Sequence, residues 1–167
     1  MAQILVVDDE VGIRELLSEI LADEGHSVVL AENAASARRA RSERRPDLVL
    51  LDIWMPDTDG ISLLKEWSSA NLLTMPVVMM SGHGTIDSAV EATRIGAVDF
   101  LEKPIALQKL LQTIKKALKY DVVSPRSPLT LDVFARSLLL KDLKRRLEQA
   151  AANTSVILLR RIGRAHV

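Results

Sequence analysis

The sequence contains no cysteine and no long apolar run, and these absences exclude several classes of protein. Without cysteine there is no disulfide framework, no zinc site built from thiolates and no thiol redox centre. No apolar run approaches the roughly 20 residues that a membrane-spanning helix requires. The amino terminus, MAQILVVDDE, turns acidic before a signal-peptide core could form. We therefore expect a cytoplasmic protein that is neither secreted nor inserted into a membrane.

The chain has 167 residues, of which 48% are hydrophobic and 26% charged, as in a globular protein with one domain and a short appendage. Its zero net charge hides an asymmetry. Residues 1–120 hold 13 Lys and Arg against 18 Asp and Glu, whereas residues 121–167 hold 9 against 4. An acidic body argues against nucleic-acid binding. The two prolines of DVVSPRSPLT, which follows Tyr120, indicate a linker there.

Before this linker, short apolar runs alternate with segments of helical periodicity. The predicted strands are Gln3–Val7, Ser27–Leu30, Asp47–Leu51, Pro76–Met80 and Val98–Leu101. Helices are predicted between them, ending near Gly25 and covering about 33–44, 61–70, 85–95 and 107–118. Because the strands are continuously apolar, we expect a parallel sheet that is buried on both faces. The predicted fold class is α/β, a five-stranded parallel doubly wound sheet followed by a linker and a C-terminal helix.

Polar residues follow the predicted strands at the end where such sheets bind ligands. Asp8 and Asp9 follow the first strand, Asp52 the third, Ser81 the fourth and Lys103 the fifth. A single Asp after a strand usually caps a helix or forms a turn. Polar residues at the ends of four strands are better explained by one common site.

The chemistry of these residue types indicates phosphoryl transfer. Three clustered carboxylates repel one another unless a cation is present, and Mg²⁺ prefers oxygen ligands and phosphate. An aspartate can also act as a nucleophile and form an aspartyl phosphate. A lysine and a hydroxyl opposite it would supply a charge and a hydrogen bond to the phosphoryl group.

Four motifs that occur in a fixed order carry a resemblance to a known family. They are LVVDDE at 5–10, LVLLDIWMPDTDG at 48–60, VVMMSGHG at 77–84 and DFLEKPI at 99–105. With these motifs, residues 3–119 resemble the receiver domain of bacterial two-component response regulators, a flavodoxin-like fold. The resemblance covers about two-thirds of the chain.

The resemblance implies a phosphoacceptor and a metal site. By it, Asp52 accepts the phosphoryl group, and Mg²⁺ is held by Asp8, Asp9, Asp52 and the backbone carbonyl of Trp54. For the Trp54 side chain two interpretations stay open. It is either a partly exposed aromatic without a role or a bulky lid that hinders the access of water to the phosphoacceptor.

The resemblance also assigns the residues that sense the phosphoryl group. Lys103 and Ser81 would contact it, Pro104 would be the family's cis-proline, and Phe100 would be the switch aromatic. Many family members have Thr and Tyr where this chain has Ser81 and Phe100. We expect phosphorylation to draw Ser81 toward the phosphoryl group and to turn Phe100 inward.

Residues 81–105 resemble the nitrogen-regulation type of receiver, which activates sigma-54 promoters through a AAA+ ATPase domain. We divide the chain into a receiver domain (1–120), a linker (121–132), a truncated start of an AAA+ domain (133–159) and a tail (160–167) that is a candidate for vector-derived sequence. The motif G-x-x-x-x-G-K-[ST] does not occur. We therefore expect neither ATP hydrolysis nor specific DNA binding from this chain, although the full-length protein would bind DNA and sigma-54 RNA polymerase.

The expected partners are a sensor histidine kinase and a second copy of the chain. The homodimer would form through the face made of the 85–95 helix, the fifth strand and the last receiver helix, or through a helix at 131–151. Two other functions are open to the same topology. A Mg²⁺-dependent phosphatase would need an Asp as general acid at position 54, which is Trp, and a flavin-binding domain would need a Gly/Ser/Thr-rich loop in place of DDEVG.

Overall fold

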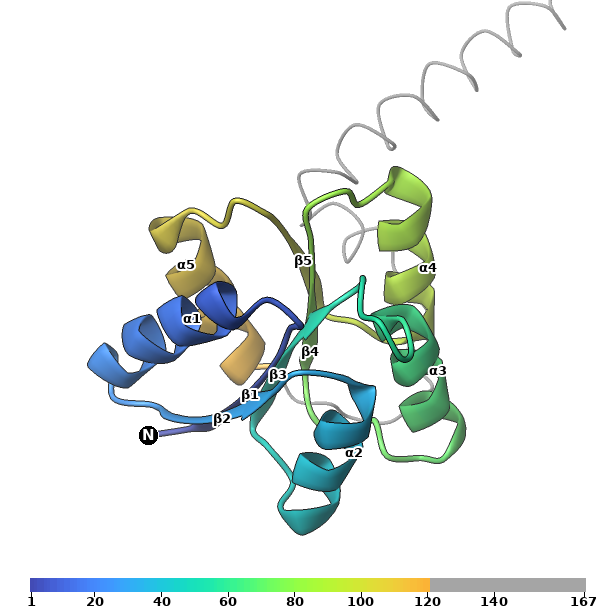
Figure 1. The fold of residues 1–167 in the computed structure, drawn as a ribbon, viewed down its shortest axis with the longest axis horizontal. Helices are drawn as coiled ribbons and strands as arrows, with labels where there is room; N and C mark the ends of the chain where they lie inside the picture. Colours follow the sequence, from blue (N-terminus) through green and yellow to red (C-terminus); the bar gives the residue numbers. More distant parts are fainter. Residues whose placement is uncertain (121–167) are drawn as a thin grey trace, which may run out of the picture. The chain divides into compact units, whose positions relative to one another are not determined.

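The computed structural model describes residues 1–120, which form one parallel five-stranded sheet flanked by five helices (Figure 1). The strands lie side by side in the order β2-β1-β3-β4-β5. They are β1 (Gln3–Val7), β2 (Ser27–Ala31), β3 (Leu48–Asp52), β4 (Val77–Ser81) and β5 (Asp99–Glu102). The predicted α/β class and the doubly wound parallel sheet are thus confirmed.

Three strands lie one residue further along the chain than predicted. β3 includes Asp52, β4 includes Ser81 and β5 includes Glu102. The apolar pattern stops before each polar residue, but the parallel pairing continues, with Asp52 opposite Met80 and Ser81 opposite Glu102. Asp52 and Ser81 therefore sit on the regular end of the sheet, whereas Asp8, Asp9 and Lys103 lie just after the ends of β1 and β5.

The helices begin and end where the sequence has capping residues. They are α1 (Val11–Asp23), α2 (Ala34–Glu43), α3 (Gly60–Ser69), α4 (Ile86–Ile95) and α5 (Leu107–Leu118). Asn33 caps α2 by accepting a hydrogen bond from Ser36 N, in a capping box. Gly96 ends α4 with a φ of 135°, a backbone conformation that strongly favours glycine.

The sheet separates two groups of helices (Figure 1). Alternate strand residues such as Ile4, Leu50 and Met80 form one core cluster with Leu17 of α1 and Ile114 of α5. Because successive strand side chains point to opposite faces, the remaining strand residues point to the other face, which α2, α3 and α4 cover. Both faces are therefore buried, as the continuous apolar strands indicate.

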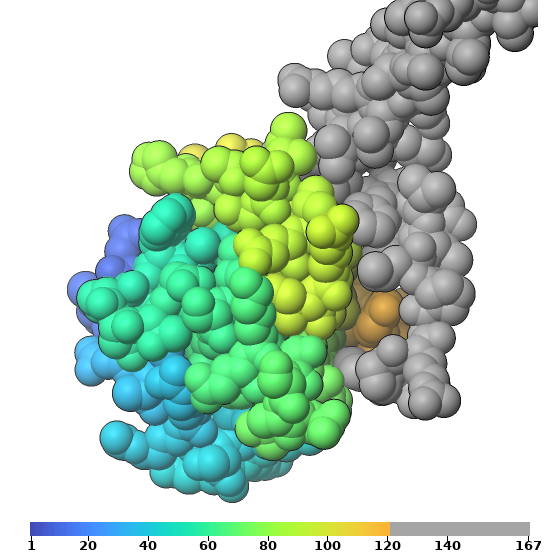
Figure 2. Space-filling model, turned by 90° about the vertical axis from the view of Figure 1, so that its right-hand side faces the viewer, coloured from blue at the N-terminus to red at the C-terminus, as the bar shows by residue number. Residues whose placement is uncertain are grey.

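Ion pairs connect the three helices of the second face, which lie next to one another in Figure 2. Arg38 of α2 binds Glu66 of α3 through two nitrogens, and Lys65 of α3 pairs with Glu91 of α4. These side chains are about half exposed, so each pair contributes at most about 1 kcal/mol. The hydrophobic contacts beneath them hold the helices on the sheet.

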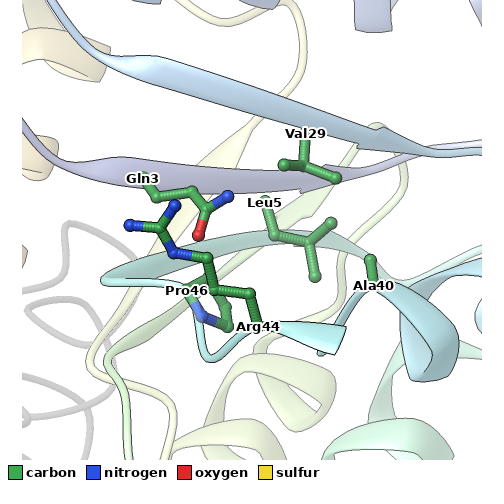
Figure 3. Close-up of a pocket in the computed structure, with 6 residues that line it drawn as sticks. All are labelled: Gln3, Leu5, Val29, Ala40, Arg44 and Pro46. Carbon is green, nitrogen blue, oxygen red and sulfur yellow. The ribbon is translucent and has the colours of Figure 1, made fainter. Parts of the chain in front are cut away.

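A small cavity lies near the amino ends of the strands, away from the carboxylates (Figure 3). It is lined by Gln3, Leu5, Val29, Ala40, Arg44 and Pro46.

No helix within residues 1–120 combines the length and apolarity needed to cross a bilayer. The predicted linker (121–132), AAA+ start (133–159), 131–151 helix and tail (160–167) lie outside the described residues.

Gly60 is the point at which α3 comes closest to the strand that carries Asp52. Its backbone N donates to Ile53 O at 2.8 Å. A Cβ atom added to Gly60 would lie 2.0 Å from the backbone oxygen of Asp52, which is far inside contact distance. Only glycine allows this approach, so the identity of residue 60 sets the distance between α3 and the end of β3.

We predict that Gly60→Ala lowers the free energy of unfolding by about 2 kcal/mol or more, because the new methyl group meets backbone that cannot move freely. Gly12→Ala is the matched control, since nothing lies within 4 Å of a Cβ at that position of α1. The control should leave stability unchanged or raise it by up to about 1 kcal/mol. Urea unfolding of both variants tests this, and equal stabilities would contradict it.

Candidate functional site

Lys103 lies among three carboxylates at the carboxyl ends of the strands. Its Nζ is 2.7 Å from Asp8 Oδ2, 3.3 Å from Glu10 Oε1 and 3.4 Å from Asp52 Oδ1. The Asp8 contact joins the ammonium group to a fully buried carboxylate, so Lys103 balances a charge that has no access to solvent.

Backbone hydrogen bonds hold these side chains in place. Asp8 N donates to Ala31 O at 3.1 Å, and Asp8 Oδ1 accepts from Glu10 N at 2.9 Å. Lys103 N donates to Ser81 O at 2.8 Å, which ties the end of β5 to the end of β4. The peptide bond before Pro104 is cis.

Burial makes the ionised form of Asp52 costly. Only 3% of Asp52 is exposed. Burial, followed by the negative charge of Asp8, raises the pKa of Asp52 from 3.8 to about 6, although Lys103 opposes the shift. For Lys103, burial acts to lower the pKa, but the interactions with Asp8 and Asp52 outweigh it and raise the pKa. The single positive charge of Lys103 is therefore surrounded by more negative charge than it can balance.

The acidic groups also fit a divalent metal. Within the described residues, carboxylate oxygens of Asp8, Asp9 and Glu10 lie within 4.8 Å of one another. Asp8 Oδ2 is buried and lies 2.7 Å from Lys103 Nζ, and a hard cation would add to the positive charge around it, since Mg²⁺ prefers oxygen ligands. The residues present therefore fit Mg²⁺.

The acidic cluster contains Asp8, Asp9 and Glu10, and Asp52 is joined to Asp8 through Lys103. The set of Asp8, Asp9, Asp52 and the Trp54 carbonyl stays a prediction. The signal for Glu10 was present in the sequence as the third acid of the DDE run. The Trp54 side chain is 60% exposed, on the loop after β3.

Ser81 and Phe100 lie next to each other on β4 and β5. Ser81 is buried, and its Oγ accepts a hydrogen bond from His83 N at 3.2 Å. Phe100 is only 7% exposed, and a Cβ added to Gly84 would lie 2.5 Å from its Cζ and 3.2 Å from Ser81 Cβ. The missing side chain at Gly84 leaves space for the buried ring. That phosphorylation moves Ser81 and Phe100 stays a prediction.

Comparison with known proteins identifies the family. The model of the response regulator receiver domain matches residues 4–115. The chain belongs to this family. It is a receiver domain, the phosphorylation-controlled switch of a two-component response regulator. A receiver domain is not in itself a catalytic enzyme.

Relatives of the receiver support its predicted type. It is 43% identical over 118 residues to the nitrogen assimilation regulatory protein NtrX of Azorhizobium caulinodans, covering 70% of this chain and 26% of that protein. A putative NtrX-like response regulator of Rickettsia bellii is 33% identical over 168 residues, 95% of this chain and 35% of that protein. The predicted resemblance to the nitrogen-regulation type is thus confirmed. The chain spans about a third or less of the length of these relatives.

Solved structures agree with the fold. The receiver domain of NtrX from Brucella abortus is 48% identical, with a TM-score of 0.66 over 71% of this chain and 99% of that one. The chemotaxis protein CheY4 of Vibrio cholerae is 28% identical and has the same TM-score of 0.66, over 70% of this chain and 98% of that one. The flavodoxin-like receiver architecture is therefore shared across distant sequences.

We predict that Asp52→Asn stabilises the metal-free receiver at pH 7.5 by about 1–3 kcal/mol, because one pKa unit corresponds to about 1.4 kcal/mol. The raised pKa means that the folded chain binds the Asp52 proton more tightly than the unfolded chain does. Wild-type stability should therefore fall as pH rises from about 4 to about 6 and then level off. The gain from Asn should vanish below pH 4.

Urea unfolding in the presence of a chelator, at pH 3.5 and at pH 7.5, measures this difference. Glu66→Gln serves as a control because it removes an exposed carboxylate that pairs with Arg38 and not with Lys103. If Asp52→Asn instead destabilised the receiver at pH 7.5, the attraction of Lys103 would outweigh the cost of burying the Asp52 charge. That result would contradict the prediction.

Proposed function

We propose that Asp52 is the phosphoacceptor and that it receives its phosphoryl group from the phosphohistidine of a sensor histidine kinase in a Mg²⁺-dependent reaction. The observation that carries the proposal is the buried Asp52 carboxylate, which sits beside Lys103 at the end of β3 with a pKa raised to about 6. Such perturbed groups concentrate at functional sites. The family membership of the chain supports the same assignment.

In the reaction, an Asp52 oxygen attacks phosphorus while the bond between phosphorus and the kinase imidazole nitrogen breaks. The imidazole nitrogen keeps the electron pair of that bond, and a proton on the other ring nitrogen lets the ring leave as neutral imidazole. Lys103, which is 3.4 Å from Asp52 Oδ1, is close enough to contact a new phosphoryl oxygen. Ser81, buried at the end of β4, would donate a hydrogen bond from its hydroxyl group to a second phosphoryl oxygen.

Mg²⁺ would be held by Asp8, Asp9, Asp52 and the backbone carbonyl of Trp54, with Glu10 close enough to assist. Bound there, it would neutralise the crowded carboxylates and the charge on the transferring phosphoryl oxygens.

The phosphorylated receiver would act on an output domain. Ser81 and Phe100 would couple Asp52 to α4, β5 and α5, shifting an equilibrium between two conformations. We propose the boundaries 1–120, 121–132, 133–159 and 160–167 for receiver, linker, AAA+ start and tail. DNA and sigma-54 RNA polymerase are proposed as partners of the full-length protein, and no ATP hydrolysis is proposed for this chain.

We predict that the chain gains one phosphoryl group when incubated with Mg²⁺ and a small phosphodonor such as acetyl phosphate. Intact mass spectrometry measures the gain directly. Asp52→Asn should abolish it because the nucleophile is lost, and excess chelator should do the same. The matched control is Asp87→Asn, which removes an exposed acid in the first turn of α4 and should still allow labelling. An Asp52→Asn chain that still gained the group would refute the assignment.

We predict a symmetric homodimer through the face formed by α4, β5 and α5 or through residues 131–151, since two-fold contacts are the default for homo-oligomers. Phosphorylation should strengthen the α4–β5–α5 contact because the proposed switch ends on that face. Sedimentation at several concentrations, with and without phosphodonor, measures the association. A monomer at high concentration under both conditions would contradict it.

A further inference from the structure

The loop between β3 and α3 is attached to a different helix through Asp57. Asp57 Oδ1 accepts a hydrogen bond from Ala34 N and Asp57 Oδ2 accepts one from Ala35 N, both at 3.1 Å. These two N–H groups belong to the first turn of α2, where backbone donors have no partner within the helix. The Asp57 carboxylate, which is more than 20 positions away in the sequence, therefore accepts hydrogen bonds from two of the free N–H groups at the α2 N-terminus.

This attachment is additional to the local cap of the helix. Asn33 already accepts from Ser36 N at 2.8 Å, so α2 does not depend on Asp57 to begin at Ala34. Burial acts to raise the pKa of Asp57, but backbone N–H groups, including those of Ala34 and Ala35, outweigh it and lower the pKa. Asp57 therefore stays ionised at neutral pH and faces the positive end of the helix dipole.

The loop that Asp57 attaches is the one that leaves the proposed phosphoacceptor. Its far end is held by Gly60 N, which donates to Ile53 O at 2.8 Å, and by Asp59, which accepts from Ser62 N at 2.9 Å as the cap of α3. In the part of the chain that the structure describes, the hydrogen bonds that join residues 54–58 to another element are the two made by Asp57. Trp54, 60% exposed, lies between these fixed points.

We propose that Asp57 is a positioning residue for the metal site, which holds the 53–59 loop on α2 and so fixes the position of the Trp54 backbone carbonyl, two residues after Asp52. The inference rests on the proposed function, in which that carbonyl is a Mg²⁺ ligand. A carbonyl on a free loop would have to be ordered each time the ion binds, and that ordering weakens binding. Asp57 orders the loop in advance through two charge-assisted hydrogen bonds.

The test is a Mg²⁺ titration of the whole chain, followed by the amide NMR signals of residues 8–10, for wild type, Asp57→Ala, Asp57→Asn and Glu66→Gln. Asp57→Ala should raise the Mg²⁺ dissociation constant about tenfold, the lower end of what loss of a supporting group costs. Asp57→Asn keeps one acceptor oxygen, so its Mg²⁺ dissociation constant should lie between those of wild type and Asp57→Ala. Glu66→Gln removes an equally exposed contact between α2 and α3 outside the loop, and should bind Mg²⁺ like wild type.

Amide hydrogen exchange without metal gives a second readout of the same bonds. Ala34 and Ala35 should exchange faster in Asp57→Ala than in wild type, while Ser36, which Asn33 caps, should be unchanged. Equal Mg²⁺ affinity in wild type and Asp57→Ala, or equal exchange at Ala34 and Ala35, would overturn the inference alone. A wild-type chain that does not respond to Mg²⁺ would overturn the proposed metal site, and the positioning role with it.

Discussion

The shared ion pair of Lys103 is the interaction on which the rest of the site depends. Asp8 and Asp52 are buried carboxylates, and a buried charge is costly unless it is paired. Lys103 pairs with both and also with the exposed Glu10, so its single charge cannot balance them all. Burial first, and the negative charge of Asp8 second, raise the pKa of Asp52. A divalent cation is the ligand that would balance the excess negative charge, and it would also offset the further negative charge that a phosphoryl group brings.

The scaffold makes this imbalance possible because it is rigid where the charges lie. Asp52 and Ser81 are the last residues of β3 and β4, so the strand pairing fixes the positions of their backbones near Lys103. Gly60 brings α3 against the backbone of Asp52, and Gly84 leaves the space that the Phe100 ring fills beside Ser81. Two glycines thus determine how closely the neighbouring elements approach the phosphoacceptor and its switch residues.

Local patterns in the sequence were sufficient to predict the fold and the edge at which the site lies. Continuous apolar strands predicted the parallel sheet, and polar residues after them predicted where Asp8, Asp52, Ser81 and Lys103 converge. The inward position of Phe100 could not be predicted, because it depends on a missing side chain at Gly84, 16 positions away. The attachment of Asp57 to α2 was likewise beyond sequence reasoning, since it joins a loop to a helix that only the fold brings together.

The central claim is that burial and carboxylate crowding, balanced incompletely by Lys103, prepare Asp52 for metal and phosphoryl. Titration of the Asp52 side-chain carboxyl carbon by NMR tests it most directly, in the unphosphorylated chain with chelator and again with saturating Mg²⁺. The account predicts a pKa of about 6 without metal and a clearly lower pKa with Mg²⁺, because the cation favours the ionised form. A pKa near the ordinary 3.8 that Mg²⁺ leaves unchanged would contradict it.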